Sequence, residues 1–227
     1  IQVSTMYPNN KSLYDLFRHS NSNLISIDSR KSFPKFVRAA IYGKHSITIR
    51  NVSERPLRTL SSLKQSSFVP TKLRSEIHKA DSDHRHHSMI HAVIRGINFD
   101  FHIYNPDDHN PIDATHPNFV AICKIISLMI DISRKFGNTQ INRYTVQIYM
   151  FDHPNTFPTT NGQPLTPENC NGAVTNQCPK EMGEILIYRK EEWVKTLFHE
   201  LSHALCIDRS ISERMTPHLR NVLVTHF

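Results

Sequence analysis

Two histidines and a glutamate near the end of the chain have a spacing that suits metal-dependent hydrolysis. His199 and His203 are four residues apart, and Glu200 directly follows the first of them, in the order His-Glu-Leu-Ser-His. Positions four apart lie on one face of a helix, so both imidazoles can bind a single Zn²⁺ ion. Glu200 lies about 100° further round, where its carboxylate can act as a base toward a metal-bound water. The pattern predicts His199 and His203 as zinc ligands and Glu200 as the catalytic base.

The residues around this motif favour a helix. Apolar side chains recur at helical spacing, at Val194, Leu197, Phe198, Leu201, Ala204 and Leu205. Glu191 and Glu192 fall in the expected first turn, where the helix dipole favours negative charge. An amphipathic helix with two hydrogen-bonded histidines and an exposed glutamate is the alternative explanation of the same residues.

Residues 199–210, HELSHALCIDRS, resemble the signature of metzincin peptidases, especially of the matrixin branch. In that family HExxH continues to a glycine and then to a third histidine, but here Cys206 and Arg209 stand at those positions. Arginine does not bind zinc, because its guanidinium stays protonated. The Cβ of Cys206 makes a left-handed backbone costly, which disfavours the turn that the family makes there. Only His199, Glu200 and His203 therefore carry over, and with them the expectation of a zinc peptidase that cleaves protein or peptide substrates.

A second resemblance covers residues 183–193, the HExxH motif and Asp208. This set resembles zinc peptidases of large nucleocytoplasmic DNA viruses. It implies a viral protein, located in the virion or the host cytoplasm. The residues at 206 and 209 leave open a second function, a catalytically inactive zincin-like structural or scaffold protein such as a minor capsid component.

The third zinc ligand is not identified by the sequence. Zinc hydrolases use three protein ligands and keep one position open. After the motif the chain offers Asp208, Glu213, His218 and His226. We expect the remaining ligand to be one of these or to lie beyond residue 227.

The remaining elements predict an α+β fold. Ile97, Phe99, Phe101 and Ile103 alternate with polar residues, which predicts a half-buried strand with a partner at 89–95. Residues 118–136 predict a long apolar helix capped by Gly137. Further strands are expected at 46–52, 144–151 and 183–189.

The order of strand, backing helix, strand, strand and HExxH helix resembles the upper half of a zincin catalytic domain. It predicts a mixed sheet with a backing helix and an active-site helix. The last strand, 184–188, is then expected to border the cleft and to pair along its edge with an extended peptide.

Charge divides the chain into two predicted parts. Residues 1–80 hold 14 Lys and Arg against 4 Asp and Glu, a net charge of +10, whereas residues 81–227 have a net charge of −3. We expect a basic N-terminal extension at 1–80, followed by the zincin-like domain at 81–227. The extension should bind an acidic partner, either nucleic acid or an acidic protein surface, with an affinity that falls as salt rises. The most apolar segment, 119–132, contains Lys124 and Asp131 and is too short to span a membrane.

Cysteines and clustered histidines leave further alternatives. Cys170 and Cys178 bracket a short loop, so a disulfide between them is one arrangement, while Cys123 and Cys206 are expected as buried thiols. His84, His86, His87 and His91 lie close together in the sequence. Their spacing matches no ligand template, and a solvated loop is the expectation, with metal binding as the alternative.

Overall fold

The computed structural model describes residues 45–52, 62–83, 86–106, 112–136, 138, 141–153 and 171–209. These residues form a mixed α+β structure with a mixed sheet, which confirms the α+β part of the predicted fold class. All of them belong to one compact unit, residues 44–227. The predicted cap at Gly137 and the candidate ligands Glu213, His218 and His226 lie outside the described residues.

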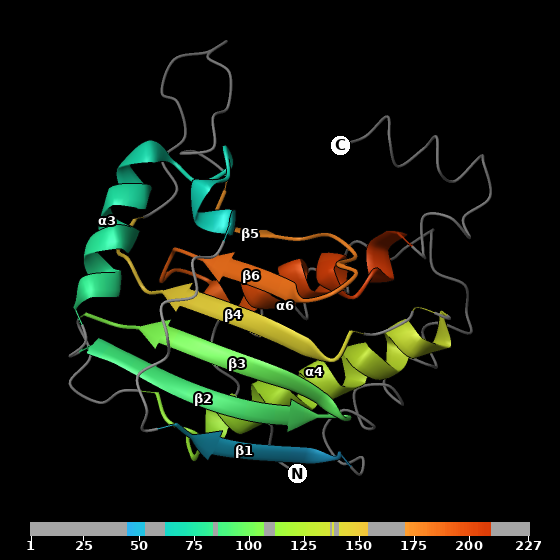
Figure 1. Ribbon diagram of the computed structural model, residues 1–227. Coiled ribbons are helices and arrows are strands. Elements are labelled where there is room, and N and C mark those ends of the chain that lie inside the picture. The colour runs from blue at the N-terminus through green and yellow to red at the C-terminus, as the bar shows by residue number, and fades with distance from the viewer. Residues whose placement is uncertain are drawn as a thin grey trace, which may run out of the picture. The chain divides into compact units, whose positions relative to one another are not determined.

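Six strands form a single mixed sheet in the order β1-β2-β3-β4-β6-β5 (Figure 1). Their bounds are β1 Ile47–Asn51, β2 His87–Ile94, β3 Ile97–Tyr104, β4 Arg143–Tyr149, β5 Ala173–Thr175 and β6 Gly183–Ile187. The first three strands are antiparallel neighbours, β3, β4 and β6 run parallel, and β5 pairs antiparallel with β6. The strands predicted at 46–52, 89–95, 97–104, 144–151 and 183–189 are therefore confirmed, with shifts of a few residues at their ends.

One face of the sheet is covered by two helices, α4 (Pro117–Lys135) and α6 (Trp193–Ala204), which lie behind the strands in Figure 1. Phe99 and Phe101 of β3 are fully buried on this face, as the alternation predicts, but Asp100 between them is also buried, so β3 is more than half-buried. They share a core with Ile126 of α4 and Leu201 of α6. Because parallel strands need a crossover, α4 joins β3 to β4, as the long apolar segment predicts.

The opposite face carries a smaller core near the C-terminal ends of the parallel strands. The short helix η1 (Ser62–Gln65) and the helix α3 (Thr71–Ser82) cover it (Figure 1). Their apolar residues pack with aromatic side chains at the strand ends, including Tyr104, Tyr149 and Tyr188. Strand β1 and most of α3 come from the first 80 residues, so the basic part of the sequence contributes to the sheet and to this second core.

The prediction that residues 184–188 form the edge of the sheet is wrong. Strand β5 pairs with the outer side of β6, from Ala173 opposite Ile187 to Thr175 opposite Ile185. Accordingly, all five residues of β6 are buried. The edge strand is β5, which is too short for its alternation to show in the sequence and lies in the stretch that composition predicts to be a loop.

Gly183 allows β6 to pack against an aromatic ring. It lies opposite Tyr144 of β4, and a Cβ atom at this position would overlap that ring. Tyr144 is buried, and its hydroxyl donates to the carbonyl oxygen of Ala204 at the end of α6, 3.4 Å away. The glycine therefore helps to fix the last turn of α6.

We expect the substitution Gly183→Ala to lower the free energy of unfolding by about 2–3 kcal/mol, because the packed ring cannot move without strain. Gly172→Ala is the matched control, since a Cβ there meets only ordinary contacts, with Arg189 at 3.6 Å. Urea unfolding of the two variants provides the measurement. Equal midpoints would contradict the close approach of Tyr144.

Candidate metal site

Helix α6 packs one side against the core and carries the two histidines of the HExxH motif on its outer side. Leu197, Leu201 and Ala204 are buried against the sheet and α4. His199 is exposed and His203 is half-buried, so both imidazoles lie on the outer side of the helix. The predicted helix is confirmed, although it begins at Trp193, after Glu192 in a left-handed conformation.

The two imidazoles meet at one point. Nε2 of His199 lies 3.1 Å from Nε2 of His203, and the rings stand edge to face at 87°. Two nitrogens bound to one tetrahedral zinc ion at about 2.0–2.1 Å would be about 3.3 Å apart. The observed spacing therefore suits two ligands of one zinc ion, and it equally allows a direct hydrogen bond between the rings.

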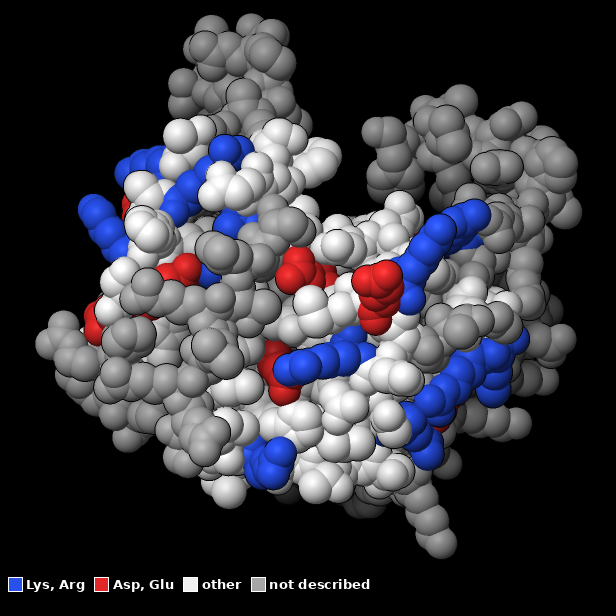
Figure 2. All heavy atoms as spheres, in the orientation of Figure 1, with Lys and Arg blue, Asp and Glu red and all other residues white. Residues whose placement is uncertain are grey.

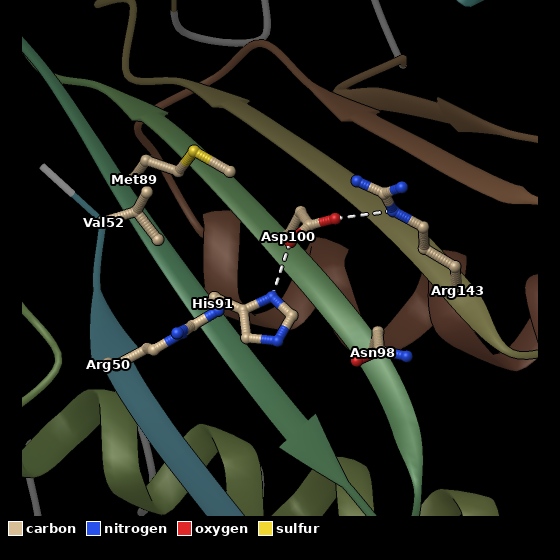
Figure 3. A pocket seen from close by; sticks show the side chains of 7 residues that line it. All are labelled: Arg50, Val52, Met89, His91, Asn98, Asp100 and Arg143. Carbon is tan, nitrogen blue, oxygen red and sulfur yellow. Dashed lines mark hydrogen bonds and ion pairs between the residues drawn. The ribbon is translucent and has the colours of Figure 1, made fainter. Parts of the chain in front are cut away.

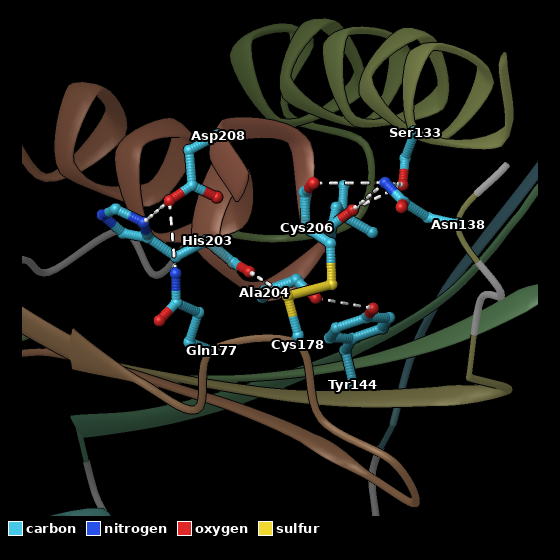
Figure 4. The surroundings of a disulfide bond; sticks show 10 residues. Ser133, Asn138, Tyr144, Gln177, Cys178, His203, Ala204, Cys206 and Asp208 are labelled. Carbon is cyan, nitrogen blue, oxygen red and sulfur yellow. Dashed lines mark hydrogen bonds and ion pairs between the residues drawn. A yellow bond between two sulfur atoms is a disulfide. The ribbon is translucent and has the colours of Figure 1, made fainter. Parts of the chain in front are cut away.

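Asp208 binds the other nitrogen of His203. Its Oδ2 accepts from His203 Nδ1 at 2.7 Å and from Gln177 Nε2 at 3.3 Å (Figure 4). Because Asp208 holds Nδ1, the Nε2 atom of His203 points toward His199 in the tautomer that a metal needs. The carboxylate thus orients a histidine from behind, on the side of the ring opposite to the shared point.

Burial shifts the pKa of Glu200 and the pKa of His199 in opposite directions. Glu200 is buried, with 8% exposed, and burial raises the pKa of its carboxyl group, while the charge of His203 acts to lower it. Burial lowers the pKa of His199, and the neighbouring His203 lowers it further. A lowered pKa favours the neutral imidazole, which is the form that binds metal.

A disulfide bond connects the end of α6 to the loop before β6. It joins Cys178 to Cys206, whose Cα atoms are 5.1 Å apart (Figure 4). The suggested pairing of Cys170 with Cys178 and the prediction of Cys206 as a buried thiol are therefore wrong. Sequence spacing did not show this pair, because only the fold brings the two residues together. Cys123 is a free buried thiol, as predicted.

The chain turns at Cys206 despite the Cβ atom. Its φ is +56°, in the left-handed region that the sequence led us to disfavour. The turn is fixed from several directions, since Cys206 N donates to His203 O at 3.1 Å and Asn138 Nδ2 donates to the carbonyl oxygens of Leu205 and Cys206 at 3.2 Å. These bonds and the disulfide offset the cost of the conformation and place Asp208 beside His203.

The described residues contain no group of three or more His, Cys, Asp or Glu side chains that could hold a metal ion. The site within them consists of His199, His203 and the orienting Asp208. The histidine cluster at 84–91 does not form a second centre there. His87 bonds to the carbonyl oxygen of Ala80 at 2.9 Å, His91 bonds to Asp100 at 2.7 Å, and His84 lies outside the described residues.

Comparison with known proteins adds no relative. No protein-family model, curated protein or solved structure matches this chain. Among the described helices, none is long and apolar enough to cross a membrane.

Proposed function

We propose that this protein is a zinc-dependent peptidase with a zincin-like catalytic domain. The observation that supports this most directly is the convergence of the two Nε2 atoms of His199 and His203, 3.1 Å apart on one helix. Asp208 behind His203 is the kind of carboxylate partner that metal-binding histidines commonly have. Histidine nitrogens are ligands that zinc prefers.

The arrangement of helices and strands also supports the proposal. Helices α4 and α6 cover the same face of the sheet, and both belong to its larger core. A backing helix and a metal-binding helix on one face are what the resemblance to zincins implies. The edge strand β5 lies beside α6, so an extended peptide substrate is the class that this domain would take.

Each residue of the motif has a distinct role in this proposal. His199 and His203 hold the metal, and Asp208 fixes the orientation of His203. Bound zinc would polarise a carbonyl group and make a water molecule more acidic. Glu200 accepts the proton of the attacking water and delivers it to the leaving amine. Its raised pKa suits the first of these steps, because it makes the carboxylate a stronger base toward the attacking water.

Zinc content tests the site directly. We expect the purified protein to hold one zinc ion per chain by elemental analysis, and His203→Gln to hold none. Asp208→Asn should lower the zinc affinity by about 10- to 100-fold, because the amide no longer fixes the His203 tautomer. Asp152→Asn, an exposed aspartate after β4, is the matched control and should keep the wild-type affinity.

Zinc below stoichiometric amounts, together with a melting temperature that chelation does not change, would contradict this proposal. Such a result would favour the second function, a zincin-like structural or scaffold protein, for instance in a virus particle. Arg209 at the position of the family's third histidine is the observation in its favour.

A further inference from the structure

A second polar site lies on the sheet face opposite α6. It is a depression of about 370 Å³ on the outer surface of β1 to β4 (Figure 3). Arg50, His91, Asp100 and Arg143 supply its charged and polar groups, and Val52 and Met89 line one end. Figure 2 looks onto this face, where basic and acidic side chains lie together over the strands. The size is within the range of sites that bind small molecules.

Strand register brings these residues together. Arg50 of β1 lies directly opposite His91 of β2, which in turn lies opposite Asp100 of β3. Arg143 of β4 lies opposite Asn98, two residues from Asp100 on the same face. Because side chains on one face of neighbouring strands are in contact range, four strands contribute to one group.

Asp100 organises the group. The residue is 4% exposed, and its carboxylate accepts from His91 Nδ1 at 2.7 Å and from Arg143 Nε at 2.8 Å. Burial raises the pKa of Asp100, but the hydrogen bonds from His91 and Arg143 outweigh burial and leave the pKa below its ordinary value. Asp100 therefore stays ionised, and both of its oxygens are occupied by its neighbours.

The same hydrogen bonds leave other polar atoms of His91 and Arg143 directed outward. Since Nδ1 of His91 bonds to Asp100, its Nε2 is the ring atom available to a ligand. Arg143 bonds to Asp100 through Nε, which leaves its two terminal nitrogens on a side chain that is 62% exposed. Arg50 is exposed and makes no hydrogen bond or ion pair with the described residues. The depression contains two guanidinium groups and one carboxylate, so it has an excess of positive charge.

We propose that this depression binds a small organic phosphate monoester. Arg50, Arg143 and His91 approach from three different strands, and a tetrahedral phosphate can form hydrogen bonds in three directions, whereas the two oxygens of a carboxylate lie in one plane. A phosphate monoester titrates near pH 6, so its monoanion can donate a proton to Nε2 of His91 while its other oxygens accept from the arginines. Val52 and Met89 provide the apolar contact for the organic part of the ester. This inference does not depend on zinc or on α6.

Calorimetric titration of the full chain with phenyl phosphate, inorganic phosphate and acetate, at constant ionic strength, tests the proposal. We expect phenyl phosphate to bind most tightly, inorganic phosphate less tightly, and acetate at least about tenfold more weakly than phenyl phosphate. Arg50→Gln should weaken phenyl phosphate binding by about tenfold or more, because it removes a charged donor. The matched control is Arg134→Gln on α4, which removes one arginine from the other side of the sheet and should leave affinity unchanged.

Arg50→Lys separates charge from geometry if Arg50→Gln does not fold. It keeps the charge but loses the fork of donors, so its affinity should fall between those of the wild type and a charge-free site. Absence of phenyl phosphate binding, or equal binding by the wild type and Arg50→Gln, would overturn the site. Equal affinities for phenyl phosphate and inorganic phosphate would contradict the assignment of an ester as the ligand. An affinity for acetate equal to that for inorganic phosphate would contradict the assignment of a phosphate group.

Discussion

Replacing Glu200 by Gln is expected to lower kcat/KM for peptide hydrolysis by at least about 100-fold and by up to about 10⁴-fold. The amide is almost the same size as the carboxylate but cannot accept the proton of the attacking water. Neither of the two proposed zinc ligands is altered, so the variant should keep the metal content of the wild type. Because Glu200 is buried and its carboxyl pKa is raised, replacing it by a neutral group should leave the stability of the fold unchanged or slightly increased.

Glu191→Gln is the matched control for this experiment. Glu191 is exposed just before α6, and the same change there should leave hydrolysis and zinc content at wild-type values. Hydrolysis that continues in Glu200→Gln at the wild-type rate would rule out Glu200 as the base. If both the wild type and the variant bind zinc but neither cleaves a broad peptide library, the scaffold function is favoured.

Local sequence patterns predicted the strands and helices whose own apolar residues form a recognisable pattern. Alternating apolar residues marked β3, a long apolar stretch marked α4 and helical spacing marked α6, because each element packs into the larger core. The same spacing placed His199 and His203 on one face of α6, where their Nε2 atoms meet. These predictions depend only on neighbours within one element, which is why the sequence alone supports them.

Contacts between distant segments were not predictable in this way. Strand β5 has only three residues, so it has no alternation to recognise. The pairing of His91 with Asp100 and Arg143 depends on the register of three strands. The position of Asp208 in the sequence makes it a candidate metal ligand, but the left-handed turn at Cys206 directs its carboxylate to His203 Nδ1. A turn at a non-glycine residue carries no sequence signal, because it depends on the contacts that fix it.

The disulfide between Cys178 and Cys206 is expected to make one of the largest contributions to stability among the described contacts. It closes a loop with a sequence separation of 28. The loss of chain entropy in the unfolded state corresponds to about 3–4 kcal/mol for a loop of this size. Replacing both cysteines by serine should therefore lower Tm by roughly 10 °C for a chain of this length. Differential scanning calorimetry without reductant provides the measurement.

The proposed zinc site should weaken together with the fold in the double serine variant. Cys206, at one end of the disulfide, lies in the turn that places Asp208 behind His203. Cys178, at the other end, donates its backbone N–H to the carbonyl oxygen of His203 at 3.2 Å. Without the covalent connection, the histidine is held less firmly, so we expect the variant to lose zinc at a lower chelator concentration than the wild type. Wild-type protein treated with reductant should show the same change, and the variant should not respond to reductant.

A comparison of two single substitutions separates the covalent bond from the backbone conformation. Cys206→Ser and Cys206→Gly both remove the disulfide, but only glycine adopts the left-handed conformation at 206 without a steric cost. We expect the glycine variant to be more stable than the serine variant by about 1 kcal/mol, with both below the wild type. If reductant leaves the wild-type Tm unchanged, the disulfide does not stabilise the fold. If serine and glycine variants unfold at the same urea concentration, the hydrogen bonds from Asn138 and to His203 are sufficient to hold the turn, and the left-handed conformation at Cys206 has no measurable cost.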